Sequence, residues 1–256
     1  MPGTGVDHGD VAGQTEACMA IATTTDDRTA VVGSRWWRPR VPATVGYLAA
    51  LVIVTSIFSA LSDSAQSKVV LHASTNLHNL LQGRVVTLLS SALVIGDVGT
   101  AWLIMPLLAC LLALAELRFG ALHMVRVFLA GHIGATLLVA AGLWVAVEFD
   151  WLPASVRWSE DVGISYGAMA LIGALLFVVP SRWRIAWGAV WFAGAVAGVL
   201  LGQTFTNVGH LVAYCIGSAV GYGMIRTKTP VTRRFTKVEL ALLGTSMVLA
   251  AAMLFG

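Results

Sequence analysis

Two side chains that could carry out nucleophilic chemistry together stand near the starts of two apolar stretches. Ser165 lies near the beginning of the apolar stretch 162–179, and His210 lies near the beginning of the stretch 208–225. A serine hydroxyl becomes an effective nucleophile when a neighbouring base takes its proton, and histidine is a common base. A Ser–His pair without a carboxylate is a reduced form of the catalytic triad, which is recognised by its geometry. We therefore predict that Ser165 and His210 meet as a hydrolytic dyad.

Each residue also has a purely structural interpretation. A serine in a membrane helix commonly bonds the backbone of its own helix or a neighbour, whereas a histidine inside a membrane is rarer and more often functional. A second histidine, His132, lies in the middle of another apolar stretch. We expect it to make a helix-packing hydrogen bond. The alternative is that His132 and His210 are the proton or substrate groups of a small transporter, although the chain shows no convincing internal repeat.

The elements that must position these side chains are membrane helices. Of the 256 residues, 57% are hydrophobic and 11% are charged, against about 25% charged in a soluble domain. Apolar stretches of 17 or more residues recur along the chain. They are too long for the strands of a barrel, and in lipid only helices and closed barrels satisfy their backbone. The sequence therefore predicts an all-α polytopic membrane helical bundle.

Seven membrane spans are expected, as a six-helix core followed by a seventh C-terminal helix. Their approximate ranges are 45–61, 98–115, 122–147, 162–179, 185–201, 208–225 and 238–255. The intervening segment 62–97 is too polar to span but keeps a helical spacing of valine and leucine, which predicts an amphipathic re-entrant or interfacial segment.

Three regions follow from this pattern. Residues 1–40 are expected to be a disordered cytoplasmic tail that ends in a basic and aromatic membrane anchor. Residues 41–225 form the six-span domain, and residues 226–256 form a basic link and the seventh helix.

Charge in the loops predicts the orientation. With the N-terminus inside, the inner segments hold 13 Lys and Arg residues and the outer segments hold three. Cytoplasmic loops carry the excess of Lys and Arg, so we expect a cytoplasmic N-terminus, an external C-terminus and a location in the plasma membrane. Ser165 and His210 then both lie in the outer half of the bundle. The net charge of +3 is explained by this asymmetry and does not indicate a nucleic-acid partner.

Small residues on the helix of His210 predict how it packs. Ala213, Gly217 and Gly221 repeat every four residues, and such faces let helix backbones approach closely. We expect Gly217 to lie where this helix contacts the helix of Ser165. The three cysteines, Cys18, Cys110 and Cys215, are far apart and show no metal-binding or disulfide spacing, so no metal or cofactor is expected.

Over about residues 45–225, the sequence resembles the rhomboid family of intramembrane serine proteases. The fourth span of that family begins with the motif G-x-S-G, and Gly163-Ile164-Ser165 matches its first three positions. The sixth span carries a histidine followed by small residues, which Gly209-His210, Gly217 and Gly221 resemble. The second span ends in a glutamate, a basic residue and a glycine, which Glu116-Leu117-Arg118-Phe119-Gly120 resembles.

The resemblance implies hydrolysis of peptide bonds in single-span or polytopic membrane protein substrates within the lipid bilayer. Ser165 is then the nucleophile and His210 the base, and the backbone N–H groups around Gly163-Ile164-Ser165 contribute to the oxyanion site. The sequence departs from the family at two places. Tyr166 stands at the second glycine of the motif. The second-span histidine and asparagine are absent, and Thr100 falls about where that histidine is expected and could donate a hydrogen bond.

A rival interpretation is a proteolytically inactive rhomboid-like protein that binds transmembrane helices. Two structural expectations accompany both interpretations. Asp97 should cap the second span, and Glu116 and Arg118 should form a charge pair at the inner face.

Overall fold

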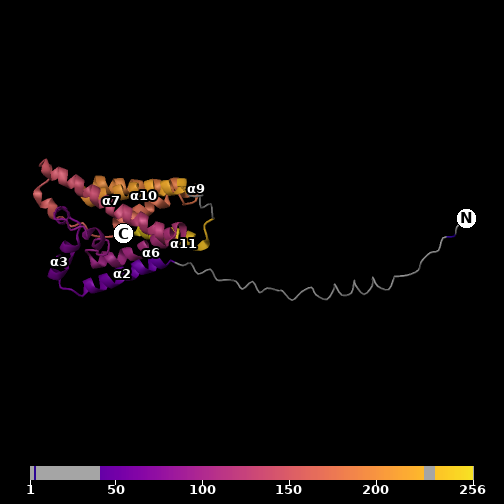
Figure 1. Ribbon diagram of the computed structural model, residues 1–256, viewed down its shortest axis with the longest axis horizontal. Coiled ribbons are helices and arrows are strands. Elements are labelled where there is room, and N and C mark those ends of the chain that lie inside the picture. Colours follow the sequence, from indigo (N-terminus) through magenta and orange to yellow (C-terminus); the bar gives the residue numbers. More distant parts are fainter. Residues whose placement is uncertain (1–2, 4–40, 228–233, 256) are drawn as a thin grey trace. The chain divides into compact units, whose positions relative to one another are not determined.

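The computed structural model describes Gly3, residues 41–227 and residues 234–255, with the side chains of these residues except Thr227 and residues 251–255. The chain divides into two units, Met1–Arg38 and Pro39–Gly256. The tail predicted for residues 1–40 lies outside the described residues apart from Gly3, as do residues 228–233 of the basic link. The second unit is the helical bundle in Figure 1.

The described residues form helices and connecting turns, without a strand, so the predicted all-α class is confirmed. The elements in chain order are α2 (Pro42–Ser59), α3 (Asp63–Ala73), α4 (Leu77–Leu81), α5 (Thr87–Ser90), α6 (Val98–Phe119), α7 (Ala121–Glu148), η1 (Ala154–Trp158), α8 (Ser165–Leu175), α9 (Ser181–Ala197), η2 (Gly198–Gly202), α10 (Phe205–Thr227) and α11 (Lys237–Phe255).

Five helices within the described residues are long and apolar enough to cross a membrane. They are α2, α6, α7, α9 with its continuation η2, and α10. The sequence also predicts spans at α8 and α11. α8 has only 11 residues, and at about 1.5 Å per residue it covers about half of a hydrocarbon core of about 30 Å. The predicted span 162–179 is therefore wrong in length, because residues 162–164 precede the helix and residues 176–178 form a turn after it.

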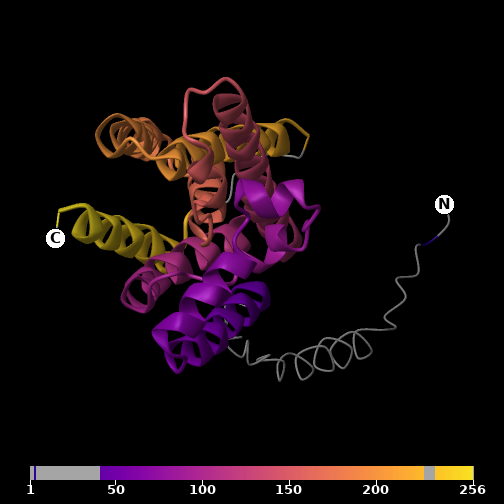
Figure 2. The same cartoon turned by 90° about the vertical axis from the view of Figure 1, so that its left-hand side faces the viewer.

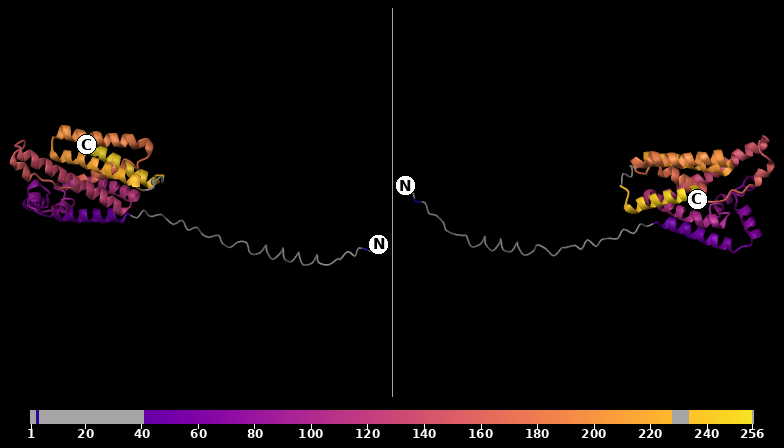
Figure 3. Two further views of the ribbon diagram at one scale, coloured as in Figure 1. Left: turned by 45° about the horizontal axis from the view of Figure 1, so that its top comes forward. Right: turned by 180° about the vertical axis from the view of Figure 1, so that it is seen from behind.

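α8 is the central helix of the bundle. It packs against α7, α10 and α6, while α2 and α11 pack against α6. α9 packs against α10, and the Trp187 indole on α9 donates a hydrogen bond to the Ile172 carbonyl on α8 at 3.0 Å. Figure 2 shows α11 in the space between α6 and α9, and the right-hand view of Figure 3 agrees.

Carboxylates accept from backbone N–H groups at the starts of α6 and α2. The Asp97 side chain accepts from the Thr100 N–H at 2.6 Å, which confirms the predicted cap of α6. The second carboxylate, Glu116 near the end of α6, accepts from the N–H groups of Ala43 and Thr44 at 3.0 and 2.7 Å and from the Thr44 hydroxyl at 2.7 Å. Glu116 therefore satisfies the first turn of α2, whose donors have no intrahelical acceptor.

Arg118 attaches α11 to the end of α6. Its Nε lies 3.3 Å from a Glu239 carboxylate oxygen, and both side chains are buried. The guanidinium lies over the Phe235 ring, 3.5 Å from the ring centre. The charge pair predicted between Glu116 and Arg118 is therefore wrong, because tertiary packing gives each residue a partner on a different helix.

The segment 62–97 forms the three short helices α3, α4 and α5, held by polar contacts. Asn79 donates to the carbonyls of Leu71 and Ser74 at 2.9 and 2.8 Å. The Tyr47 hydroxyl of α2 donates to the Ala92 carbonyl at 2.6 Å. These bonds satisfy the irregular backbone of the segment, as burial requires.

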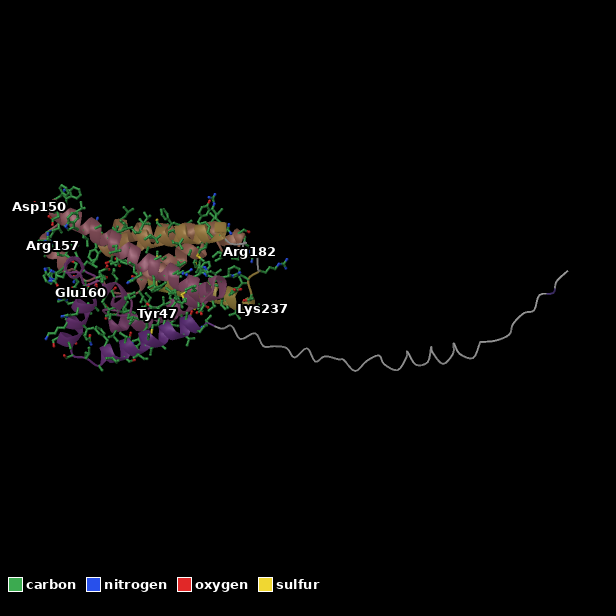
Figure 4. All side chains as sticks on the ribbon, viewed as in Figure 1. Tyr47, Asp150, Arg157, Glu160, Arg182 and Lys237 are labelled. Atoms are coloured by element: carbon green, nitrogen blue, oxygen red, sulfur yellow. The ribbon has the colours of Figure 1, made fainter. Side chains whose placement is uncertain are left out.

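Charged side chains gather at the two ends of the bundle. Figure 4 shows Asp150, Arg157 and Glu160 at one end, and Arg182 and Lys237 at the opposite end. The end with Arg182 and Lys237 carries the basic loops, and the sequence predicts that this end is cytoplasmic.

Candidate active site

Ser165 is the first residue of α8, and the backbone before it is shaped by a glycine. Gly163 has a φ of +121°, a conformation that side chains disfavour. Its N–H donates to the Ser91 carbonyl at 2.8 Å. Ser91 belongs to the segment 62–97, the first loop of the bundle, so this loop fixes where α8 begins. The N–H of Gly163 is thereby occupied, so in this structure it is not free for the predicted oxyanion site.

The loop before Ser165 is held to the first loop by further bonds. The Asp161 carbonyl accepts from the Thr75 N–H at 3.0 Å, and the Asp161 N–H donates to the Ser74 hydroxyl at 2.8 Å. Because both partners are buried, this connection resists displacement. The first loop therefore acts as a scaffold that positions the start of α8.

His210 is the sixth residue of α10, and glycines bring its helix against α8. A Cβ at Gly217 would collide with the Ala170 backbone, and a Cβ at Gly221 would lie 2.7 Å from Ala174 Cα. Ala213 is fully buried in a cluster with Ala135 and Tyr166. Gly217 and Gly221 therefore lie at the contact between α10 and α8, with Ala213 buried on the same helix.

Ser165 and His210 line one cavity of about 330 Å³. The wall contributed by α6 is apolar and consists of Ile104, Leu107, Leu108 and Leu111. Trp191 of α9 and Ala250 of α11 line the same cavity. The tertiary structure thus brings the two predicted catalytic residues, far apart in sequence, to one apolar space among the spans.

The two side chains do not form a hydrogen bond. His210 Nε2 is buried and has no hydrogen-bond partner among the described residues. Such bonds are often long or absent without substrate and form only in the reacting complex. His210 is therefore available as a base or donor toward a group that enters the cavity.

The Tyr166 ring contacts the His210 ring. The ring centres are 5.5 Å apart with an interplanar angle of 79°, an edge-to-face arrangement, which is favourable for aromatic pairs. Gly209 makes this possible, since a Cβ there would collide with the Tyr166 ring. The residue that departs from the family motif thus restrains His210 and is itself buried.

Thr100 is not brought to the pair. It is exposed in the first turn of α6, where its N–H bonds Asp97, and it does not line the cavity. The α6 residue that reaches the cavity first is Ile104, one helical turn later. The structure therefore does not bring Thr100 to the cavity where an oxyanion donor is predicted, because the cavity begins deeper along α6.

A second Ser–His pair, which the sequence analysis missed, lies outside this cavity. Ser91 Oγ and His132 Nε2 are 3.1 Å apart, and both residues are buried. The predicted hydrogen bond of His132 is confirmed, but its partner belongs to the first loop and not to another span. Neither residue lines a described cavity with room for a substrate. We interpret this bond as structural, since it ties α7 to the loop that holds Gly163.

Asp161 is the main electrostatic feature of the loop before α8. Burial raises the pKa of its carboxyl from 3.8 to about 6, and the Tyr166 hydroxyl lowers the pKa in the opposite direction. The carboxyl is therefore protonated to a larger extent near pH 6 than an exposed aspartate. The described residues contain no group of three or more Asp, Glu, His or Cys side chains that could hold a metal ion.

The fold and the cavity define a polytopic helical membrane protein with polar groups among its spans. A protein-family comparison matches residues 37–231 to the family described as rhomboid-like protein. The match covers most of the chain and includes Ser165 and His210, so the chain belongs to the rhomboid-like family. No curated protein and no solved structure matches it.

Proposed function

We propose that the chain is an intramembrane serine protease that hydrolyses peptide bonds of transmembrane substrates. The observation that carries the proposal is the shared cavity, in which Ser165 and an unpartnered His210 Nε2 lie among the membrane helices. An apolar pocket with a few convergent polar groups is the usual form of a binding site. Membership of the rhomboid-like family supports the same reaction class.

In the proposed mechanism, Ser165 Oγ attacks the carbonyl carbon of a substrate peptide bond, and His210 Nε2 takes the hydroxyl proton. Collapse of the tetrahedral intermediate breaks the C–N bond as His210 returns the proton to the leaving amine. Water then hydrolyses the acyl-enzyme with the same base. Tyr166 restrains the imidazole by its edge-to-face contact.

The position of Ser165 at a helix start also favours this chemistry. The first N–H groups of a helix lack intrahelical acceptors and carry the positive end of the helix dipole. The N–H groups of Ile164 and Ser165 have no acceptor among the described residues. They are the backbone donors that remain for an oxyanion, since Gly163 is bonded to Ser91.

A second candidate function is an inactive relative that binds transmembrane helices. It is favoured by the apolar α6 wall of the cavity and by the missing bond between Ser165 and His210. In this case the cavity would accept an apolar side chain of a bound helix and no covalent step would follow.

Labelling by a fluorescent alkyl fluorophosphonate in phosphatidylcholine liposomes tests the two functions against each other. Under the proposal, wild type is labelled, and Ser165→Ala and His210→Ala are not. Ser91→Ala is the matched control, because it makes the same change in the buried Ser–His pair and should keep labelling while the protein is folded. If wild type and Ser165→Ala give equal signals, the chain is an inactive helix-binding relative.

A further inference from the structure

A residue that lines the cavity of the proposed dyad carries a buried donor without an acceptor. Trp191 of α9 lines the cavity of Ser165 and His210, and its Nε1 is buried with no hydrogen-bond partner among the described residues. An indole N–H can only donate. Burying it without an acceptor is unfavourable, and such exceptions in folded proteins call for an explanation.

The neighbouring tryptophan shows how this helix satisfies an indole when the role is structural. Trp187 stands one turn earlier on α9, and its Nε1–H donates to the Ile172 carbonyl at 3.0 Å. The two rings are in contact, with centres 5.8 Å apart. Trp187 thus has a protein acceptor while Trp191 does not, although both lie on one face of the same helix.

The cavity also lacks the hydrogen-bond donors for an oxyanion that were expected from α6 and from Gly163. α6 contributes only Ile104 and three leucines, Thr100 is not part of the cavity, and Gly163 N–H is used by Ser91. A hydrolytic site needs donors aimed at the oxygen on which charge develops. Apart from the proposed dyad, Trp191 contributes a side-chain donor without an acceptor among the described residues that line this cavity, and it belongs to α9 and not to α6.

We propose that Trp191 is a catalytic residue whose Nε1–H donates to the scissile carbonyl oxygen of a substrate bound at Ser165, replacing the polar donors absent from α6. This inference rests on the proposed protease function. It assigns the missing part of the oxyanion site to α9, with the Ile164 and Ser165 N–H groups completing it.

The test compares Trp191→Phe with Trp187→Phe, which remove one indole N–H each and keep an aromatic ring. The readouts are the maximal rate and the half-saturating concentration of labelling by the fluorescent fluorophosphonate, whose phosphoryl oxygen occupies the oxyanion position. For Trp191→Phe we expect a fall of about a hundredfold in the maximal rate, the loss typical of one oxyanion donor, with little change in half-saturation. Folded Trp187→Phe should label at the wild-type rate.

Thermal unfolding of the same proteins without probe separates this role from a structural one. Removing an unpaired buried donor should leave the melting temperature of Trp191→Phe equal to or above that of wild type, whereas Trp187→Phe should lower it. The proposal is overturned if Trp191→Phe labels like wild type, if only half-saturation changes, or if it is destabilised like Trp187→Phe, as a water-bridged structural indole would be. Labelling of Ser165→Ala at the wild-type rate would instead refute the protease function itself.

Discussion

Tyr166 shows how one residue can fill a position usually held by glycine and still support its neighbour. Its ring contacts His210 edge to face and is buried against Gly209. Aromatic pairs of this kind contribute about 0.5–1.5 kcal/mol. The Tyr166 ring restrains the His210 imidazole, so its loss should lower the reactivity of Ser165 as well as the stability of the protein.

The first prediction separates the ring of Tyr166 from its hydroxyl. Tyr166→Leu removes the ring contact and should slow fluorophosphonate labelling of Ser165 about two- to tenfold, the range that an aromatic pair supports. Tyr166→Phe keeps the ring and should restore most of the rate. Equal rates for the leucine and phenylalanine variants would show that the ring does not position His210.

The second prediction concerns Asp161, whose carboxyl is buried in the loop before α8. Burial raises its pKa to about 6 in the folded protein, above its ordinary value of 3.8. Between these values the folded state binds more protons than the unfolded state, so stability falls as pH rises from about 4 to about 6. Asp161→Asn cannot ionise and should lose this dependence, with a gain of about 1–3 kcal/mol at pH 7.

Thermal unfolding in detergent across pH 4 to about 7 measures this difference. Glu148→Gln is the control, because Glu148 lies in an exposed pair with Arg157 at 2.9 Å, which contributes little. If wild type and Asp161→Asn give parallel curves, the Asp161 carboxyl is not the source of the pH dependence.

At the scale of elements, glycine decides how close α10 comes to α8. The backbones meet at Gly217 and Ala170 so tightly that a methyl group at position 217 has no space. A backbone atom cannot turn away as a flexible side chain can. The same contact therefore sets both the stability of the bundle and the approach of His210 to the cavity.

The third prediction is that Gly217→Ala destabilises the protein by about 1–3 kcal/mol or more, the cost of overpacking a tight contact, and lowers labelling of Ser165. Gly194→Ala is the matched control, because a Cβ there meets nothing within 4 Å. It should be neutral or stabilising by about 0.5–1 kcal/mol, since alanine favours a helix. Equal melting temperatures for the two variants would contradict the close contact.

At the scale of the whole bundle, α11 lies between α6 and α9 (Figure 2), and its residue Ala250 lines the cavity of Ser165 and His210. Its first turn is attached to α6 by the buried pair of Arg118 and Glu239, and Ala250 lines the cavity farther along the helix. A substrate helix that approaches between α6 and α9 must therefore meet α11 first.

The fourth prediction tests whether α11 hinders this approach, without relying on catalysis. In a background with Cys18, Cys110 and Cys215 replaced by alanine, Ser165→Cys should react slowly with a lipid-soluble maleimide. Adding Glu239→Gln should loosen α11 and raise the rate about tenfold. An open state that is populated at about 1–10% in the parent protein can increase by about this factor. Val248→Ala, at a position 69% exposed on α11, should not change the rate. An unchanged rate in folded Glu239→Gln protein would show that α11 is no barrier.

The fifth prediction concerns orientation. Arg157 and Arg182 lie at opposite ends of the bundle (Figure 4), and the basic end should be cytoplasmic. In intact cells, a membrane-impermeant maleimide should label Arg157→Cys and label Arg182→Cys only after lysis, in the same cysteine-free background. The reverse pattern would invert the topology.

The sequence by itself determined the helical membrane class, the approximate position of most spans and the two polar side chains of the proposed site. These follow from local properties, because the length of apolar stretches, the charge asymmetry of the loops and the spacing of small residues can be read directly from the sequence. The cap at Asp97 is equally local, since the carboxylate and its N–H partner are three residues apart. The resemblance of Gly163-Ile164-Ser165 and His210 to rhomboid motifs can likewise be read from the sequence alone.

Only the tertiary structure decided which polar groups meet. The bond of Ser91 to His132, the pair of Arg118 with Glu239 and the cap of α2 by Glu116 join residues far apart in the chain. Spacing along one helix could not reveal them, since the partners depend on how helices are rotated and shifted against each other. The same packing left Thr100 outside the cavity and placed Trp191 in its wall.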